Sequence, residues 1–197
     1  LLKIAPQILK FSQPVWKRLN ELKTKIENLN ITGYEHPFLN VSRCDDEKSN
    51  YVNAVQWHKI NYQHNISIKQ KEVSSNRKKR ISFICGELRD HPTFYLIKNM
   101  FQYLNKEAFD YYLFTYNHDQ DYLNIIEKHV SMVVDINNKS DDQIESMLRE
   151  HDLDILIDLS VHIPHNKMNV VNRKLARKTI SYLGFPGSTG SDNYDYI

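Results

Sequence analysis

One histidine of this sequence stands where an imidazole could do chemistry. His91 lies in CGELRDHPTFY, residues 85–95, between an apolar run and a stretch with helical spacing. Pro92 suits the first turn of a helix, because its missing N–H is no loss there, so His91 should lie just before the helix begins. The positive end of that helix disfavours an imidazolium, and a neutral ring could accept a proton or polarise a ligand oxygen. A nearby Asp90 would oppose this effect or fix the tautomer of the ring. The alternative is that Asp90 or His91 only caps the helix.

A second candidate is the glycine-rich segment GFPGSTG at residues 184–190, which holds three of the five glycines of the chain. Glycine lets a backbone reach left-handed conformations and approach a ligand closely. The spacing matches neither the dinucleotide fingerprint nor a phosphate loop, so a plain turn is the alternative. His162 follows another apolar run and could point into the same cleft or serve only in packing.

Other kinds of site are disfavoured. His36, His162 and His165 lack the i, i+4 helical pairing of a zinc protease, and no convincing metal-binding set is visible. Neither cysteine has an evident activating neighbour, so thiol chemistry is a weak hypothesis. We interpret the basic run at residues 77–80 as a solvated linker before a strand rather than a phosphate-binding patch or a localisation signal.

Composition narrows the class of protein. The chain has 197 residues, of which 41% are hydrophobic, so it can bury a real core. A formal charge of +2 is too small for a nucleic-acid footprint or a membrane-surface patch. Two cysteines form no disulfide framework, which favours a reducing compartment and a cytoplasmic location. No segment approaches the roughly 20 apolar residues of a membrane span. The absence of an initial methionine suggests that the chain is an excerpt of something longer.

The elements that would position these residues alternate between strands and helices. Strands are predicted at residues 81–85, 111–116, 132–134, 153–159 and 178–183. Helices are predicted at residues 93–106, 122–130 and 140–150, the last capped by Ser140. Strands separated by such helices pair in parallel through right-handed crossovers. Residues 77–197 therefore read as a Rossmann-like α/β sheet, and ligands of such sheets bind where the strands end.

The first 76 residues do not show this alternation of strands and helices. Apolar residues at three- and four-residue steps predict an amphipathic helix at residues 15–29. The segment at residues 35–38 breaks the chain, and a second helix is predicted at residues 46–63. Residues 65–80 are polar and basic and are typical of a linker. We therefore divide the chain into a helical segment, 1–76, and the Rossmann-like domain, 77–197.

Three motifs in this order resemble a known family. RISFICGELRDHPTFYL, HDLDILIDLSVH and SYLGFPGSTGSDNYDYI are similar to the first half of the catalytic region of protein O-GlcNAc transferases, the SPINDLY-like group included. The resemblance covers about residues 34–197. It implies the N-terminal lobe of a GT-B glycosyltransferase, a second lobe downstream and tetratricopeptide repeats upstream. It also implies inverting transfer of GlcNAc from UDP-GlcNAc to Ser or Thr of a protein or peptide, with no metal or other cofactor. Nucleic acid and membrane partners are not expected, and the oligomeric state is left open.

The resemblance assigns roles to particular residues. His91 matches the family histidine beside the acceptor and phosphate, which makes it the candidate catalytic residue. The segment after the last strand matches the loop that lies against the donor sugar. The implied substrate-binding residues are Asp90, Pro92, Thr93, His162, Leu183, Gly184, Pro186, Gly187 and Thr189.

The chain also departs from the family pattern. Val161 stands where relatives commonly have glycine, and Met132 replaces a histidine often found ahead of the aspartate of the third strand. These departures motivate an alternative: a catalytically degenerate lobe that binds peptide or scaffolds a partner. A third possibility keeps the chemistry and changes the sugar or the acceptor. Since the second lobe carries most nucleotide contacts in the family, the 197-residue chain alone is expected to be inactive.

Overall fold

The computed structural model describes residues 17, 21, 34–42, 44–62 and 77–197. The helix predicted at residues 15–29 and most of the predicted linker therefore lie outside the described residues. Contacts within the chain group residues 1–35 into one compact unit and residues 36–197 into another. The fold described below is that of the second unit. The division at residue 76 stays a prediction about domain organisation.

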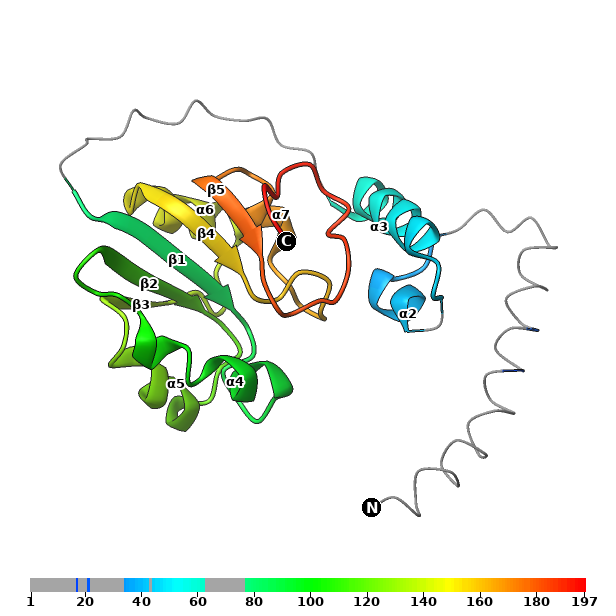
Figure 1. Cartoon of the computed structure of the whole chain (residues 1–197). Helices are drawn as coiled ribbons and strands as arrows, with labels where there is room; N and C mark the ends of the chain where they lie inside the picture. The colour runs from blue at the N-terminus through cyan, green and yellow to red at the C-terminus, as the bar shows by residue number, and fades with distance from the viewer. Residues whose placement is uncertain (1–16, 18–20, 22–33, 43, 63–76) are drawn as a thin grey trace, which may run out of the picture. The chain divides into compact units, whose positions relative to one another are not determined.

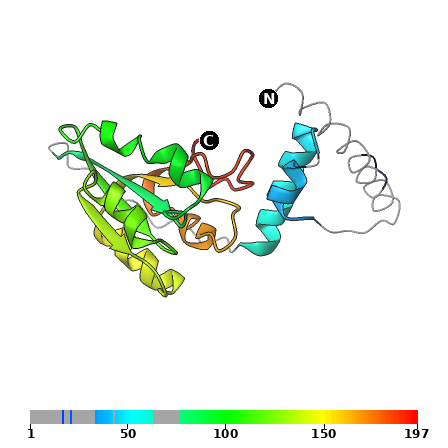
Figure 2. The same ribbon diagram turned by 90° about the horizontal axis from the view of Figure 1, so that it is seen from below.

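Five parallel strands form one sheet in the order β3-β2-β1-β4-β5. The arrows of these strands point the same way in Figure 1, and Figure 2 shows the same sheet from below. The strands are β1 (Lys79–Cys85), β2 (Phe109–Thr115), β3 (Met132–Asp135), β4 (Leu153–Asp158) and β5 (Ala176–Ser181). The predicted Rossmann-like α/β architecture is confirmed. Because the chain runs outward from β1 to β3 and then returns to β4, the strand order reverses between β1 and β4.

Neighbouring side chains of the central strands alternate between two separate cores, as the strand period of two requires. Phe83 and Leu113 belong to a core with α4 (Pro92–Ile97) and α5 (Gln120–Glu127). Ile84 and Phe114 belong to a core with α6 (Asp141–Glu150) and α7 (Met168–Val171). Both faces of the sheet are thus covered, which explains why its strands read as nearly continuous apolar runs.

Some element boundaries differ from the sequence-based prediction. The helix predicted at residues 93–106 ends at Ile97 and is followed by a 3-10 turn, η1 (Phe101–Tyr103). The Met100 N–H donates to the Ile97 carbonyl, three residues back, and Phe101 is fully buried. Apolar residues three and four apart fit either helix type, so their spacing did not reveal this tightening. In contrast, Ser140 caps α6 as predicted, with a reciprocal bond to Gln143 that completes a capping box.

Two helices precede the sheet within the same compact unit. The predicted helix at residues 46–63 is confirmed as α3 (Glu47–Asn61). The break predicted at residues 35–38 instead begins a short helix, α2 (Pro37–Val41), because proline fits its first position and His36 caps it. α3 is held by a buried hydrogen bond of 2.8 Å between His58 Nε2 and Asn172 Nδ2.

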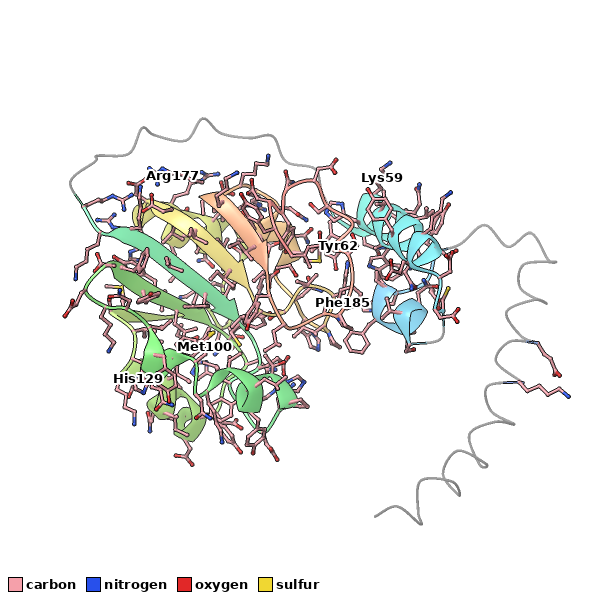
Figure 3. The ribbon with its side chains drawn as sticks, viewed as in Figure 1. Lys59, Tyr62, Met100, His129, Arg177 and Phe185 are labelled. Atoms are coloured by element: carbon pink, nitrogen blue, oxygen red, sulfur yellow. The ribbon has the colours of Figure 1, made fainter. Side chains whose placement is uncertain are left out.

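The basic run at residues 77–80 is not a solvated linker, so that prediction is wrong. Lys79 and Arg80 are the first residues of β1, and Arg77 Nη1 lies 2.6 Å from Asp154 Oδ2. Arg177 Nη1 lies 3.2 Å from Asp154 Oδ1, which joins β1, β4 and β5 at their amino ends. Figure 3 shows Arg177 at one end of the sheet and Phe185 at the other. Arg77 is paired because the buried carboxylate of Asp154 lies opposite it, and a local charge pattern does not reveal a partner so distant in the sequence.

Candidate functional site

A pocket of about 790 Å³ lies at the carboxyl ends of the strands. Its walls come from α2, from α4 and from the loops after β1, β2, β4 and β5. The lining residues are His36, Phe38, Leu39, Glu87, Arg89, His91, Pro92, Thr93, Leu96, Asn117, His162, Ile163, Pro164, His165, Leu183, Gly184 and Pro186. The loops after β1 and β4 flank the place where the strand order reverses, and open α/β sheets bind ligands at such switch points.

Seven of the ten site residues predicted from sequence line this pocket. They are His91, Pro92, Thr93, His162, Leu183, Gly184 and Pro186. The other three lie outside its lining: Asp90 Oδ1 accepts a hydrogen bond from the Tyr95 hydroxyl at 2.9 Å, and the Thr189 carbonyl lies 3.0 Å from His162 Nε2. Gly187 lies against the Phe185 ring. The structure thus brings together the two histidines and the loop after β5, whereas binding by these residues remains a prediction.

His91 caps α4 and faces the pocket with the same ring. Its Nδ1 atom accepts a hydrogen bond from the Thr93 N–H at 3.2 Å, so a neutral ring carries its hydrogen on Nε2. Nε2 lies 3.5 Å from Glu87 Oε2. The capping alternative and a role in the pocket are therefore compatible. In this tautomer, however, Nε2 donates a hydrogen bond and cannot accept a proton.

Two charged residues of the pocket were not singled out from the sequence. Glu87 is only 4% exposed, and its Oε2 atom accepts hydrogen bonds from Arg89 Nη2 at 2.9 Å and Nε at 3.2 Å. Both residues stand in CGELRDHP, directly after a buried strand. The sequence signal that could have identified them is a pair of opposite charges directly after a buried strand. Residues in that position fall where a parallel sheet binds its ligands.

His36 repeats the arrangement of His91. It precedes Pro37, and its Nδ1 atom accepts a hydrogen bond from the Phe38 N–H at 3.3 Å. Burial lowers the pKa of His36, which favours the neutral ring. From sequence, His36 was weighed only as a metal ligand, although the short helix that it caps contributes to one wall of the pocket.

His162 is the most enclosed of the pocket histidines. Its ring is fully buried and lies edge-on to Phe185, with ring centres 4.9 Å apart. Burial lowers the pKa of His162 to about 4, so the ring is neutral at physiological pH. A neutral ring whose Nε2 lies 3.0 Å from the Thr189 carbonyl carries its hydrogen there. His162 therefore fastens the loop after β5 to the loop after β4.

A buried carboxylate shapes the loop after β4. Asp158 accepts hydrogen bonds from the N–H groups of Ser160 and Val161 at 2.8 and 3.2 Å and from the Tyr194 hydroxyl at 2.5 Å. Burial raises the pKa of Asp158. Val161 adopts a left-handed backbone with φ of 46°, a conformation that favours glycine. The valine that departs from the family pattern thus sits at a strained position.

Gly184, in the loop after β5, is required by the packing of the protein itself. A Cβ atom on Gly184 would lie 2.0 Å from the backbone oxygen of Leu159. The loops after β4 and β5 can approach each other this closely only without a side chain at residue 184. β5 ends at Ser181, two residues earlier than the predicted strand, and Leu183 turns the chain with φ of 67°.

Two kinds of group considered from the sequence, metal-binding clusters and cysteines, can be located in the part of the chain that the structure describes. These residues contain no group of three or more His, Cys, Asp or Glu side chains placed to hold a metal ion. Cys85 is buried, and burial raises its pKa to about 12, so its thiolate is suppressed. In the described ranges, no helix combines the length and apolar character needed to cross a bilayer.

Comparisons with known proteins give a family match and similar proteins from plants. Residues 48–197 match the model of a family described as Glycosyl transferase family 41. The chain is 23% identical over 138 residues to the probable UDP-N-acetylglucosamine--peptide N-acetylglucosaminyltransferase SEC of Arabidopsis thaliana, which covers 69% of this chain and 14% of that protein. It is 34% identical over 62 residues to the probable UDP-N-acetylglucosamine--peptide N-acetylglucosaminyltransferase SPINDLY of the same plant, covering 32% of this chain and 7% of that protein.

A solved structure shares the fold. A mutant O-GlcNAc transferase of Thermobaculum terrenum superposes with a TM-score of 0.73 at 20% identity, covering 92% of this chain and 36% of that one. The chain thus spans 14% or less of the length of the two plant relatives. The family model, in contrast, matches well over half of the chain. On that match, together with the parallel sheet and its switch-point pocket, this chain belongs to glycosyl transferase family 41.

Proposed function

We propose that this chain is the N-terminal catalytic lobe of an inverting GT-B glycosyltransferase that moves a sugar from a UDP-sugar to Ser or Thr hydroxyls of proteins. The donor proposed first is UDP-GlcNAc, because the names of the plant relatives specify UDP-N-acetylglucosamine and a peptide. The observation that carries the proposal is the switch-point pocket, where the loops after β1, β4 and β5 meet in a member of this family.

The chemistry of the pocket suits such a substitution. The acceptor hydroxyl would attack the anomeric carbon on the face opposite UDP, and the bond from that carbon to the diphosphate oxygen would break. Catalysis then depends on holding the two reactants in line and on stabilising charge as UDP leaves. His91 would donate a hydrogen bond from Nε2 to a substrate oxygen, which orients that oxygen. Leu183, Gly184 and Pro186 would form the backbone wall beside the sugar.

Two of the predicted binding residues would act indirectly. Thr189 would hold His162 through its carbonyl, and Asp90 would hold the start of α4 through its bond to Tyr95. Most contacts to the nucleotide are expected on a second, downstream lobe, and tetratricopeptide repeats are expected upstream. The 197-residue chain alone should therefore transfer little or no sugar.

The test is transfer of radiolabelled sugar from UDP-GlcNAc to a panel of proteins. The complete gene product that contains this sequence should label Ser or Thr, the isolated 197-residue chain should not, and the mass added to the acceptor identifies the sugar. If the complete protein transfers no sugar and shows no heat of binding with UDP or UDP-sugars, the chain is a degenerate lobe with a scaffolding role and the proposal is wrong.

A matched pair of variants separates the two uses of the His91 ring. His91→Asn keeps an oxygen that can cap α4 and removes the Nε2 donor, whereas His91→Ala removes both. Both variants should lose turnover with the same acceptor, and only the alanine variant should also lose stability. His162→Ala should cost less turnover than either, because that ring has no exposed surface. Full activity of His91→Asn would remove the donor role from the mechanism.

A further inference from the structure

The pocket contains a single acidic side chain among its described lining residues, that of Glu87. It lies in the loop between β1 and α4, four residues before His91, and is 4% exposed. Its oxygens are unequal. Oε2 takes both hydrogen bonds from Arg89 and faces His91 Nε2, whereas Oε1 has no hydrogen-bonding partner among the residues that the structure describes. One oxygen is therefore anchored, and the other keeps its lone pairs for a ligand.

The histidines around Glu87 are arranged as donors. His36 and His91 each use Nδ1 to accept a backbone N–H, so the hydrogen of the neutral ring lies on Nε2. His162 has Nε2 beside the Thr189 carbonyl, and its Nδ1 atom is an acceptor without a partner in the described part of the chain, but that atom is buried away from solvent. His165 is exposed at the rim and is the remaining imidazole. Among the carboxyl and imidazole groups that the structure describes in this lining, the free oxygen of Glu87 is therefore the acceptor that we assign to a hydroxyl that must lose its proton.

We propose that Glu87, rather than a histidine, is the catalytic base that takes the proton of the attacking hydroxyl. The inference rests on the proposed function. As the oxygen of Ser or Thr bonds to the anomeric carbon, the electron pair of the breaking bond leaves with UDP and the hydroxyl proton passes to Glu87 Oε1. The products are the glycosylated protein, UDP and a neutral Glu87 carboxyl, which returns its proton to water.

The other polar groups fit this assignment as positioning residues. Arg89 binds Oε2 through two nitrogen atoms, which fixes the plane of the carboxylate. The Nε2–H of His91 lies 3.5 Å from the same oxygen, so it can bridge Glu87 and a substrate oxygen. A general base must lie within hydrogen-bond reach of the proton that it removes. Because Glu87 lines the pocket, an acceptor hydroxyl bound there would lie within that reach.

The test compares Glu87→Gln with Glu107→Gln in the complete gene product. Glutamine keeps the shape of Glu87 and its bonds to Arg89 but cannot take a proton. Glu107 is exposed just before β2, at the amino ends of the strands and away from the pocket. Glu87→Gln should lower kcat with a serine peptide by roughly 100- to 10,000-fold, the usual range for a lost general base. Its unfolding midpoint and its Kd for UDP-GlcNAc should stay at wild-type values. Glu87→Asp should recover part of kcat, Glu107→Gln should be unaffected, and His165→Ala should lose far less kcat than Glu87→Gln.

A peptide with cysteine in place of the acceptor serine provides a readout that a merely structural role would not move. A thiol ionises near pH 8.5 without help, so at about pH 9 the loss caused by Glu87→Gln should shrink with the thiol acceptor. Near wild-type kcat in Glu87→Gln, or the main loss of kcat in His165→Ala, overturns the inference and leaves the proposed function standing. Failure of the wild type to transfer sugar overturns both.

Discussion

The left-handed valine after β4 offers a direct test of the loop geometry. Val161 is fully buried and has φ of 46°. An L-residue with a Cβ atom loses about 1–2 kcal/mol in the left-handed conformation, and glycine escapes this cost. Replacement by alanine keeps the strain and removes two methyl groups. Replacement by glycine removes the strain and the Cβ atom as well.

The two substitutions can be ranked from these contributions. At an ordinary buried site, glycine is less stable than alanine by about 1.5 kcal/mol, since it loses another buried carbon worth about 0.8 kcal/mol and adds about 0.5–1 kcal/mol of chain entropy to the unfolded state. Release of about 1–2 kcal/mol of strain at residue 161 offsets this difference. Val161→Gly and Val161→Ala should therefore have free energies of unfolding within about 0.5 kcal/mol of each other.

Urea denaturation with two spectroscopic probes measures this difference, and Val170 provides the control. Val170 is equally buried and lies in α7, outside the residues with positive φ. Its glycine variant should be less stable than its alanine variant by at least about 1.5 kcal/mol. An equal gap between glycine and alanine at the two sites would refute the left-handed assignment of Val161.

Three further predictions concern the amino ends of the strands and the pocket. Asp154→Asn should destabilise the chain by about 2–3 kcal/mol at neutral pH, because it leaves the partly buried Arg77 and Arg177 with one ion-pair partner fewer. Burial alone would raise the pKa of Asp154, but hydrogen bonds from the Arg80 N–H and Arg77 hold it below its usual range. Its stabilisation is therefore present above about pH 4 and lost as the pH falls further, so thermal melts of wild type and variant should converge in acid. Gly184→Ala should lower the unfolding midpoint, since its Cβ would strike the Leu159 carbonyl, and an unchanged midpoint would contradict that contact. His162→Phe should keep the ring packing against Phe185 but loosen the loop after β5, seen as faster amide exchange around residues 188–191.

Much of the fold could be predicted from the sequence because its signals are local. Apolar runs such as that of β4, separated by helical spacings, indicated a parallel sheet with both faces covered, and the structure has one. Ser140 indicated the start of α6, and Pro92 placed His91 directly before α4. Each of these features depends on neighbours within about four residues, whose chemistry is written in order along the chain.

The composition of the pocket depended on contacts that no short stretch contains. His36 lines the same pocket as His91 because α2 belongs to the same compact unit as the sheet. Glu87 became a candidate base only when the bonds of Arg89 to one oxygen and the capping role of His91 were known. By itself the sequence determined the strands, the caps of α4 and α6, and the family motifs. The tertiary structure decided which polar atoms of the pocket are hydrogen-bonded within the protein and which are available to a ligand. These hydrogen bonds depend on the packing of loops that are far apart in the chain.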